Sequence, residues 1–196
     1  MSIKYHLYVF LLAALTLVSC NVPDDVSQAQ QTVALADSLR VRQASASADN
    51  LSAPDSAALA LAYHTLAKNA FRRWHYADDY TRACYHYGRQ LRQSGNQVAA
   101  MQCFIDGTHS RSRDHLTKER IYNNIGDMCH IAGEFQLSYE MFKKGAEEVK
   151  NTKDSIPYYY TLYSMALEMA ELKQTEQTHL IINEILQNCA DYDVIT

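Results

Sequence analysis

Two twenty-residue stretches decide the fold: GRQLRQSGNQVAAMQCFIDG at residues 88–107 and GDMCHIAGEFQLSYEMFKKG at residues 126–145. Both begin and end with glycine, carry another glycine at the eighth position and carry phenylalanine at the seventeenth. These four columns therefore recur after 38 residues. A repeat of about 20 to 50 residues is typical of stacked helical hairpins, because one hairpin cannot bury its apolar face alone.

The residues around the glycines fit pairs of helices. Apolar side chains recur every three or four residues on both sides of the middle glycine, which places one apolar stripe on each helix. Gly95 and Gly133 stand where the first helix must end, and glycine adopts the left-handed backbone there without a Cβ clash. Gly88 and Gly126 lie inside the first helix, where glycine costs about 1 kcal/mol relative to alanine. We therefore expect the phenylalanine of the same repeat to pack against each of these two glycines.

The order of large and small residues in these units resembles the tetratricopeptide repeat (TPR). The resemblance implies an all-α fold, an α-solenoid of antiparallel helical hairpins arranged as a TPR-like superhelix. Three TPR-like repeats are expected within residues 79–190, at about 81–114, 119–152 and 159–190, with N-terminal helices at 28–78 packing on the array. The spacing of 38 and then 40 residues exceeds the family's usual value of about 34, and the third unit lacks the first two glycines.

The amino-terminal segment predicts that the protein is exported from the cytoplasm. An apolar run from Leu7 to Val18 follows Lys4, the only charge before it, which is typical of a secretory signal peptide. The run is shorter than the ~20 apolar residues that a membrane-spanning helix needs. It ends in Leu17-Val18-Ser19-Cys20, which resembles the lipobox of bacterial lipoproteins. The alternative is an uncleaved N-terminal anchor.

The lipobox resemblance implies a lipid-anchored protein of the cell envelope. The signal peptide at 1–19 would be removed, Cys20 would carry a diacylglyceryl group with fatty acids such as palmitate, and residues 20–27 would form a flexible tether. In such lipoproteins aspartate after the cysteine often retains the protein at the inner membrane, whereas this chain has Asn21. An outer-membrane location is therefore expected, and the choice between its periplasmic face and the cell surface stays open.

Composition and motifs argue against several other classes. The 196 residues include 18 Lys plus Arg and 22 Asp plus Glu, and a formal net charge of -4 does not suit a nucleic-acid binder. Histidines are scattered, and no nucleophile elbow, phosphate loop or metal-ligand spacing is present, so we expect no enzyme, no cofactor and no metal. Cys84 and Cys129 fall in apolar columns, which favours buried thiols. A disulfide among Cys84, Cys103, Cys129 and Cys189 remains open.

The TPR resemblance also implies a function, a membrane-anchored and non-catalytic protein–protein interaction scaffold. In this family the first helix of each hairpin lines a groove that receives a peptide or a partner's helix. By position, the partner-binding groove comprises Arg82, Tyr85, Arg89, Arg92, Arg120, Asn123, Asp127, His130, Tyr160 and Tyr163. The four arginines of this groove would suit an acidic protein or peptide partner, although a solvated helix face would carry the same residue types.

Two further expectations concern the carboxyl-terminal part of the chain. Ile181 and Leu186 are expected to stay exposed on the last helix, which would allow self-association through that helix. The alternative function is the TPR sensory portion of a truncated signalling or transcriptional regulator.

Overall fold

A computed structural model of the chain describes residues 24–44, 54–70, 76–152 and 155–188. These residues form eight α-helices and no strand, so the described part of the chain is all-α, as the sequence predicts. The helices are α2 (Asp24–Ala44), α3 (Ser56–Ala70), α4 (Ala77–Gln93), α5 (Gln97–Thr108), α6 (His115–Ile131), α7 (Phe135–Val149), α8 (Ile156–Glu171) and α9 (Thr175–Asn188). The expected signal peptide, Cys20 and Cys189 lie outside the described residues.

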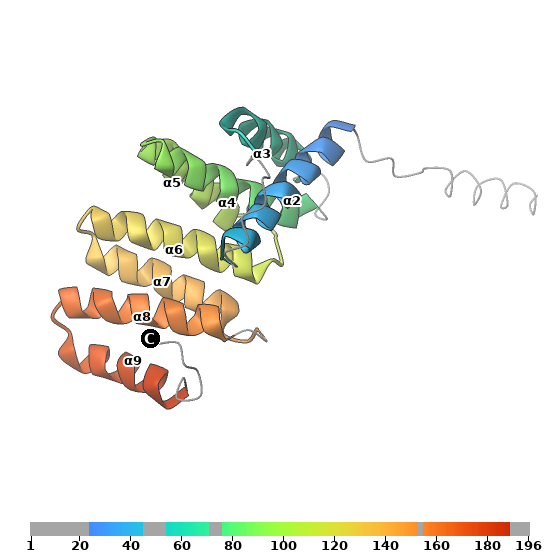
Figure 1. Ribbon diagram of the computed structural model, residues 1–196. Helices are drawn as coiled ribbons and strands as arrows, with labels where there is room; N and C mark the ends of the chain where they lie inside the picture. Colours follow the sequence, from blue (N-terminus) through green and yellow to red (C-terminus); the bar gives the residue numbers. More distant parts are fainter. Residues whose placement is uncertain (1–23, 45–53, 71–75, 153–154, 189–196) are drawn as a thin grey trace, which may run out of the picture.

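The helices follow one another in space in the order in which they occur in the chain (Figure 1). Helices α2 and α3, α4 and α5, α6 and α7, and α8 and α9 pack as pairs, and the second helix of each pair packs on the first helix of the next. The first helices α2, α4, α6 and α8 also contact one another in succession. Within the described residues, no such contact joins the second helices to one another.

The short turns inside the last three pairs share one geometry. Gly95 has φ 85°, Gly133 has φ 79° and Lys173 has φ 58°, which is the left-handed backbone expected where the first helix ends. At each turn this residue's N–H donates to the carbonyl three positions back, and the next N–H donates to the carbonyl five positions back. The third turn therefore forms without glycine, at the cost of a left-handed lysine.

The interior glycines make the close approach that the sequence predicts. A Cβ atom on Gly88 would fall 2.5 Å from Cε1 of Phe104, and one on Gly126 would fall 2.8 Å from Cε1 of Phe142. Both rings are buried, Phe104 in the main core cluster and Phe142 in a second cluster with residues of α8. The missing side chains thus make room for the rings, and the prediction is confirmed.

Helix boundaries differ from the expected ones at the amino-terminal ends. Helix α2 begins at Asp24, inside the segment 20–27 expected to be a flexible tether. Its buried stripe starts with Val26 and continues at Ala29 and Val33, so the segment gains apolar contacts by being helical. The helices α4, α6 and α8 each begin three or four residues before the expected repeat starts at 81, 119 and 159.

Helix α9 differs from the expectation at one of its two apolar positions. Ile181 is half-buried against the second core cluster, whereas Leu186 is 55% exposed. Ile181 faces α8 because α9 packs on that helix. Among the described residues, no helix has the length and apolar character that a membrane span requires.

Candidate partner-binding face

The ten residues predicted to line a groove come from α4, α6 and α8, and we call the surface of these helices that carries them the first-helix face. A hollow of about 330 Å³ opens on it and is lined by residues of all three helices. Five of the predicted residues line this hollow: Tyr85, Arg120, Asn123, Asp127 and Tyr160. The structure therefore brings half of the predicted set to one place.

A buried polar network fixes the wall of this hollow. The Glu119 carboxylate is 3% exposed, and its Oε1 accepts hydrogen bonds from Asn123 Nδ2 at 2.6 Å and Thr161 Oγ1 at 2.9 Å. Asn123 Nδ2 also lies 3.1 Å from Thr161 Oγ1. Since Thr161 belongs to α8 and the other two residues to α6, the network sets the distance between these helices.

Charged side chains join neighbouring first helices. Arg92 of α4 donates to Asn124 Oδ1 at 3.1 Å and Asp127 Oδ2 at 3.3 Å on α6. His130 Nδ1 of α6 lies 2.9 Å from Glu168 Oε1 of α8. Arg92, Asp127 and His130 thus connect the helices in addition to facing solvent, which their assignment as groove residues did not anticipate.

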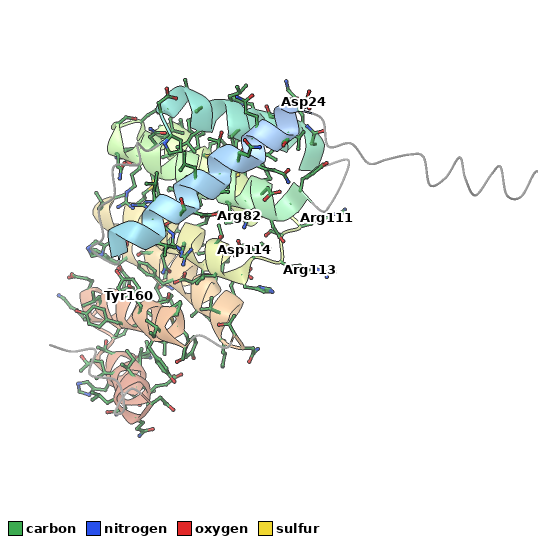
Figure 2. The ribbon with its side chains drawn as sticks, turned by 45° about the vertical axis from the view of Figure 1, so that its right-hand side comes forward. Asp24, Arg82, Arg111, Arg113, Asp114 and Tyr160 are labelled. Atoms are coloured by element: carbon green, nitrogen blue, oxygen red, sulfur yellow. The ribbon has the colours of Figure 1, made fainter. Side chains whose placement is uncertain are left out.

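Helix α2 covers part of α4, and this corrects the expectation for two residues. Tyr85 was expected to be exposed, but it is only 6% exposed and belongs to the core cluster that includes residues of α2. Arg82 lies beside α2 in Figure 2, donates to Asp79 and stands 3.7 Å from Asp37 of α2. Burial alone lowers the pKa of Arg82, but the hydrogen bond and charge of Asp79 raise it above its usual value. The positive charge of Arg82 is therefore already balanced by the carboxylates of Asp79 and Asp37 within the chain.

Asp37 holds α2 in this position. Its Oδ1 lies 2.7 Å from Nε2 of the buried His86 on α4. Burial raises the pKa of Asp37, but the hydrogen bond with His86 and the nearby charges of Arg82 and Arg40 lower it below its usual value. The aspartate is thus ionised wherever α2 is docked at neutral pH.

Two arginines meet at a second, smaller hollow. The guanidinium of Arg89 stands 5.5 Å from the centre of the Tyr85 ring, and its Nη1 lies 3.4 Å from the Tyr85 hydroxyl. Arg89 and Arg40 of α2 both line a hollow of about 170 Å³ between α2, α3 and α4.

Sequence reasoning missed Arg40, because the register that pairs α2 with α4 becomes apparent only in the structure. Gln30 bonds Asp79 and Asp37 bonds His86, so residues 49 apart face each other across α2 and α4. The same offset relates Arg40 to Arg89. Without glycines in α2, that register could not be aligned with the other repeats.

The tyrosines of α8 form the remaining part of the first-helix face. Tyr160 is 65% and Tyr163 is 55% exposed, and they share one stripe of the helix with the exposed Ile156 and Leu167. Figure 2 shows Tyr160 beyond the carboxyl end of α2. This stripe remains accessible, as the sequence predicts.

The described residues offer little reactive chemistry elsewhere. Within 24–44, 54–70, 76–152 and 155–188, no group of three or more His, Cys, Asp or Glu side chains is placed to hold a metal ion. Cys84, Cys103 and Cys129 are free and buried, which confirms the prediction for Cys84 and Cys129. Burial raises the pKa of the Cys84 thiol, which disfavours the reactive thiolate.

In comparisons with known proteins, no family model matches the chain and no curated protein matches it.

Proposed function

We propose that the chain is a non-catalytic protein–protein interaction scaffold built as an α-solenoid of TPR-like hairpins. The observation that carries the proposal is the repetition of one contact, Gly88 with Phe104 and Gly126 with Phe142, in two consecutive hairpins. The succession of contacts among first helices, without contacts among second helices, supports a curved row with α2, α4, α6 and α8 on its inner side.

The first-helix face is the proposed partner-binding surface. It combines the exposed tyrosines of α8 with arginine and asparagine side chains around the 330 Å³ hollow. Tyrosine and arginine are frequent anchors of protein interfaces because they combine large contact area with well-defined hydrogen bonding. An extended peptide or a helix of another protein would occupy this face.

Site-specific cross-linking in intact cells tests this assignment. A photoreactive phenylalanine analogue at position 160 or 163 is expected to capture the same partner, identified by mass spectrometry. The matched control is the analogue at Lys144, an exposed residue of α7. Capture from Lys144 with the same yield as from 160 and 163 would contradict a binding surface on α8.

We also propose that Cys20 anchors the chain by lipid to the outer membrane. The support is the lipobox-like Leu17-Val18-Ser19-Cys20 behind an apolar run. Partitioning into the detergent phase of a phase-separating surfactant is expected for the wild type and lost on Cys20→Ala. Persistence of that partitioning in Cys20→Ala would overturn the proposal.

Self-association through the last pair of helices is a further part of the proposal. Ile182 and Leu186 of α9 stand 40 residues after Phe142 and Ala146, which pack α7 against α8. The two α9 side chains are exposed. The last pair therefore presents the kind of apolar surface that already binds a hairpin within the chain, and a second copy would supply an identical, self-complementary patch.

A further inference from the structure

Three arginines from three successive helix pairs line the two hollows described above. Arg40 belongs to α2, Arg89 to α4 and Arg120 to α6. Arg40 and Arg89 line the 170 Å³ hollow, whereas Arg120 lines the 330 Å³ hollow together with Tyr85. Since Arg89 lies over the ring of Tyr85, this tyrosine stands between the two hollows.

None of the three guanidinium groups is paired with a carboxylate in the part of the chain that the structure describes. Within the described residues, the hydrogen bond and the ring contact of the Arg89 side chain both go to Tyr85. Arg40 has its Nε buried without a hydrogen-bond acceptor. Arg82 and Arg92 of the same face differ in this respect, because each bonds an aspartate.

The surroundings of Arg120 disfavour the positively charged form of its side chain. Burial lowers the pKa of its guanidinium, and the positive charge of Arg40 lowers it further. Tyr85, Glu119 and Asp114 act in the opposite direction but do not fully offset these two effects, because the pKa stays below its usual value. A partly desolvated positive charge whose neighbours compensate it incompletely is unfavourable, and a bound anion relieves that cost.

We propose that Arg40, Arg89 and Arg120 bind a carboxylate side chain of an acidic peptide. The inference rests on the proposed scaffold function and names the chemistry of its partner. Guanidinium groups hold carboxylates through paired, charge-assisted hydrogen bonds. The buried ring of Tyr85 positions Arg89, and its planar guanidinium stacks on the ring.

The surroundings favour a peptide over a free ion. The larger hollow continues from Arg120 past the amides of Asn123 and Asn124 to the exposed Tyr160. Both amides are hydrogen-bonded within the chain, so they form a fixed polar wall along this path. An extended segment that places one carboxylate among the arginines can therefore lay its next residues along α6 toward α8.

Binding of a labelled acidic peptide tests the proposal directly. Fluorescein-labelled hexaglutamate is expected to raise the fluorescence anisotropy with wild-type protein, whereas labelled hexaglutamine is not. Arg120→Gln, Arg89→Gln and Arg40→Gln are each expected to weaken hexaglutamate binding by about tenfold or more. The matched control is Lys143→Gln, which removes the same charge at an exposed residue of α7, outside the first-helix face.

Two results would overturn the site. One is unchanged hexaglutamate affinity in Arg120→Gln, and the other is an equal loss in Lys143→Gln, which would show a general effect of net charge. Inorganic phosphate provides a third arm. Phosphate binding that depends on the three arginines while hexaglutamate fails to bind would replace the peptide by a small anion.

A stability measurement distinguishes loss of peptide binding from loss of folding in these variants. Because Arg120 is repelled by Arg40, Arg120→Gln is expected to unfold at a temperature equal to or above that of wild type. Saturating hexaglutamate is expected to raise the unfolding temperature of wild type and not of Arg120→Gln. A lower unfolding temperature of Arg120→Gln without peptide would contradict the unpaired state of this arginine.

The test separates this inference from the scaffold proposal. If Arg120→Gln does not change which partners are cross-linked from position 160, the carboxylate site is refuted, whereas the scaffold proposal is retained. Loss of all specific capture would remove the scaffold, whatever hexaglutamate does.

Discussion

The ring of Phe104 occupies the space that a side chain on Gly88 would fill, with Cε1 2.5 Å from the Cβ position of that residue. The contact lies between the two helices of one hairpin, and the same contact joins Gly126 to Phe142 in the next. The glycine therefore determines how closely α4 and α5 approach, and the ring fills the gap that remains.

Gly88→Ala is expected to destabilise the protein by about 2 kcal/mol, because the added methyl group forces the ring of Phe104 or its helix to move. Gly95→Ala is expected to cost about 1 kcal/mol for a different reason, since a Cβ there meets nothing within 4 Å but the backbone has positive φ. Urea unfolding followed by circular dichroism measures both. Adding Phe104→Leu to Gly88→Ala should restore part of the loss and should not help Gly95→Ala.

Lys173→Gly is expected to stabilise the last helix pair by about 1 kcal/mol, because it removes the left-handed strain of a residue with φ 58°. Slower amide hydrogen exchange in α8 and α9 is the readout. The control is Lys144→Gly, inside α7, where glycine should cost about 1 kcal/mol. Faster exchange in Lys173→Gly would contradict the strain assigned to that turn.

Asp78 is expected to make stability depend on pH in acid. Its Oδ1 accepts from Ser112 Oγ at 2.6 Å and from the Arg113 backbone N–H at 2.8 Å, which ties the loop after α5 (labelled at Arg113 in Figure 2) to α4. Burial raises the pKa of Asp78, but these hydrogen bonds lower it below the usual 3.8.

A lowered carboxylate pKa means that its stabilisation is present above pH 3.8 and is lost as the pH falls through the folded-state value. The unfolding free energy of wild type should therefore decrease below about pH 4. Asp78→Asn should be less stable than wild type at pH 7, and its unfolding free energy should decrease less as the pH falls below about 4. Asp24→Asn, at an exposed carboxylate, is the control. An equal decrease in unfolding free energy with falling pH in wild type and Asp78→Asn would refute the role of this residue.

Leu186→Glu is expected to abolish concentration-dependent self-association, because it places a charge in the apolar patch of α9. Sedimentation velocity over a range of protein concentrations measures it. Val98→Glu is the matched control, since Val98 of α5 is 84% exposed and lies outside α9. An identical concentration dependence in all three proteins would remove α9 from the interface.

The hairpin interior was predictable from sequence because steric demands recur in register. Gly88 and Gly126, with their partner rings, are read directly from a 38-residue repeat. The turn at Lys173 lies 40 residues after Gly133, in the register of the earlier turns, although no glycine marks it.

The role of α2 was not predictable in the same way. Its helix was expected, but nothing in its composition indicates that it lies along α4 and buries Tyr85. The apolar stripe of α2 packs into the core, but its register on α4 is also fixed by single polar contacts such as Asp37 with His86, which leave no periodic mark in the sequence. Arg40 was missed for the same reason, because its neighbours come from other helix pairs.

The polar links between first helices also have a mechanical consequence. Asp37 with His86, Arg92 with Asp127 and His130 with Glu168 join the row along one edge, while the second helices do not touch within the described chain. Side-chain links of this kind can break and re-form without exposing the hydrophobic core, and dissolved salt weakens the ion pair of Arg92 with Asp127. The resistance of the row of first helices to bending therefore depends in part on polar side-chain links of this kind.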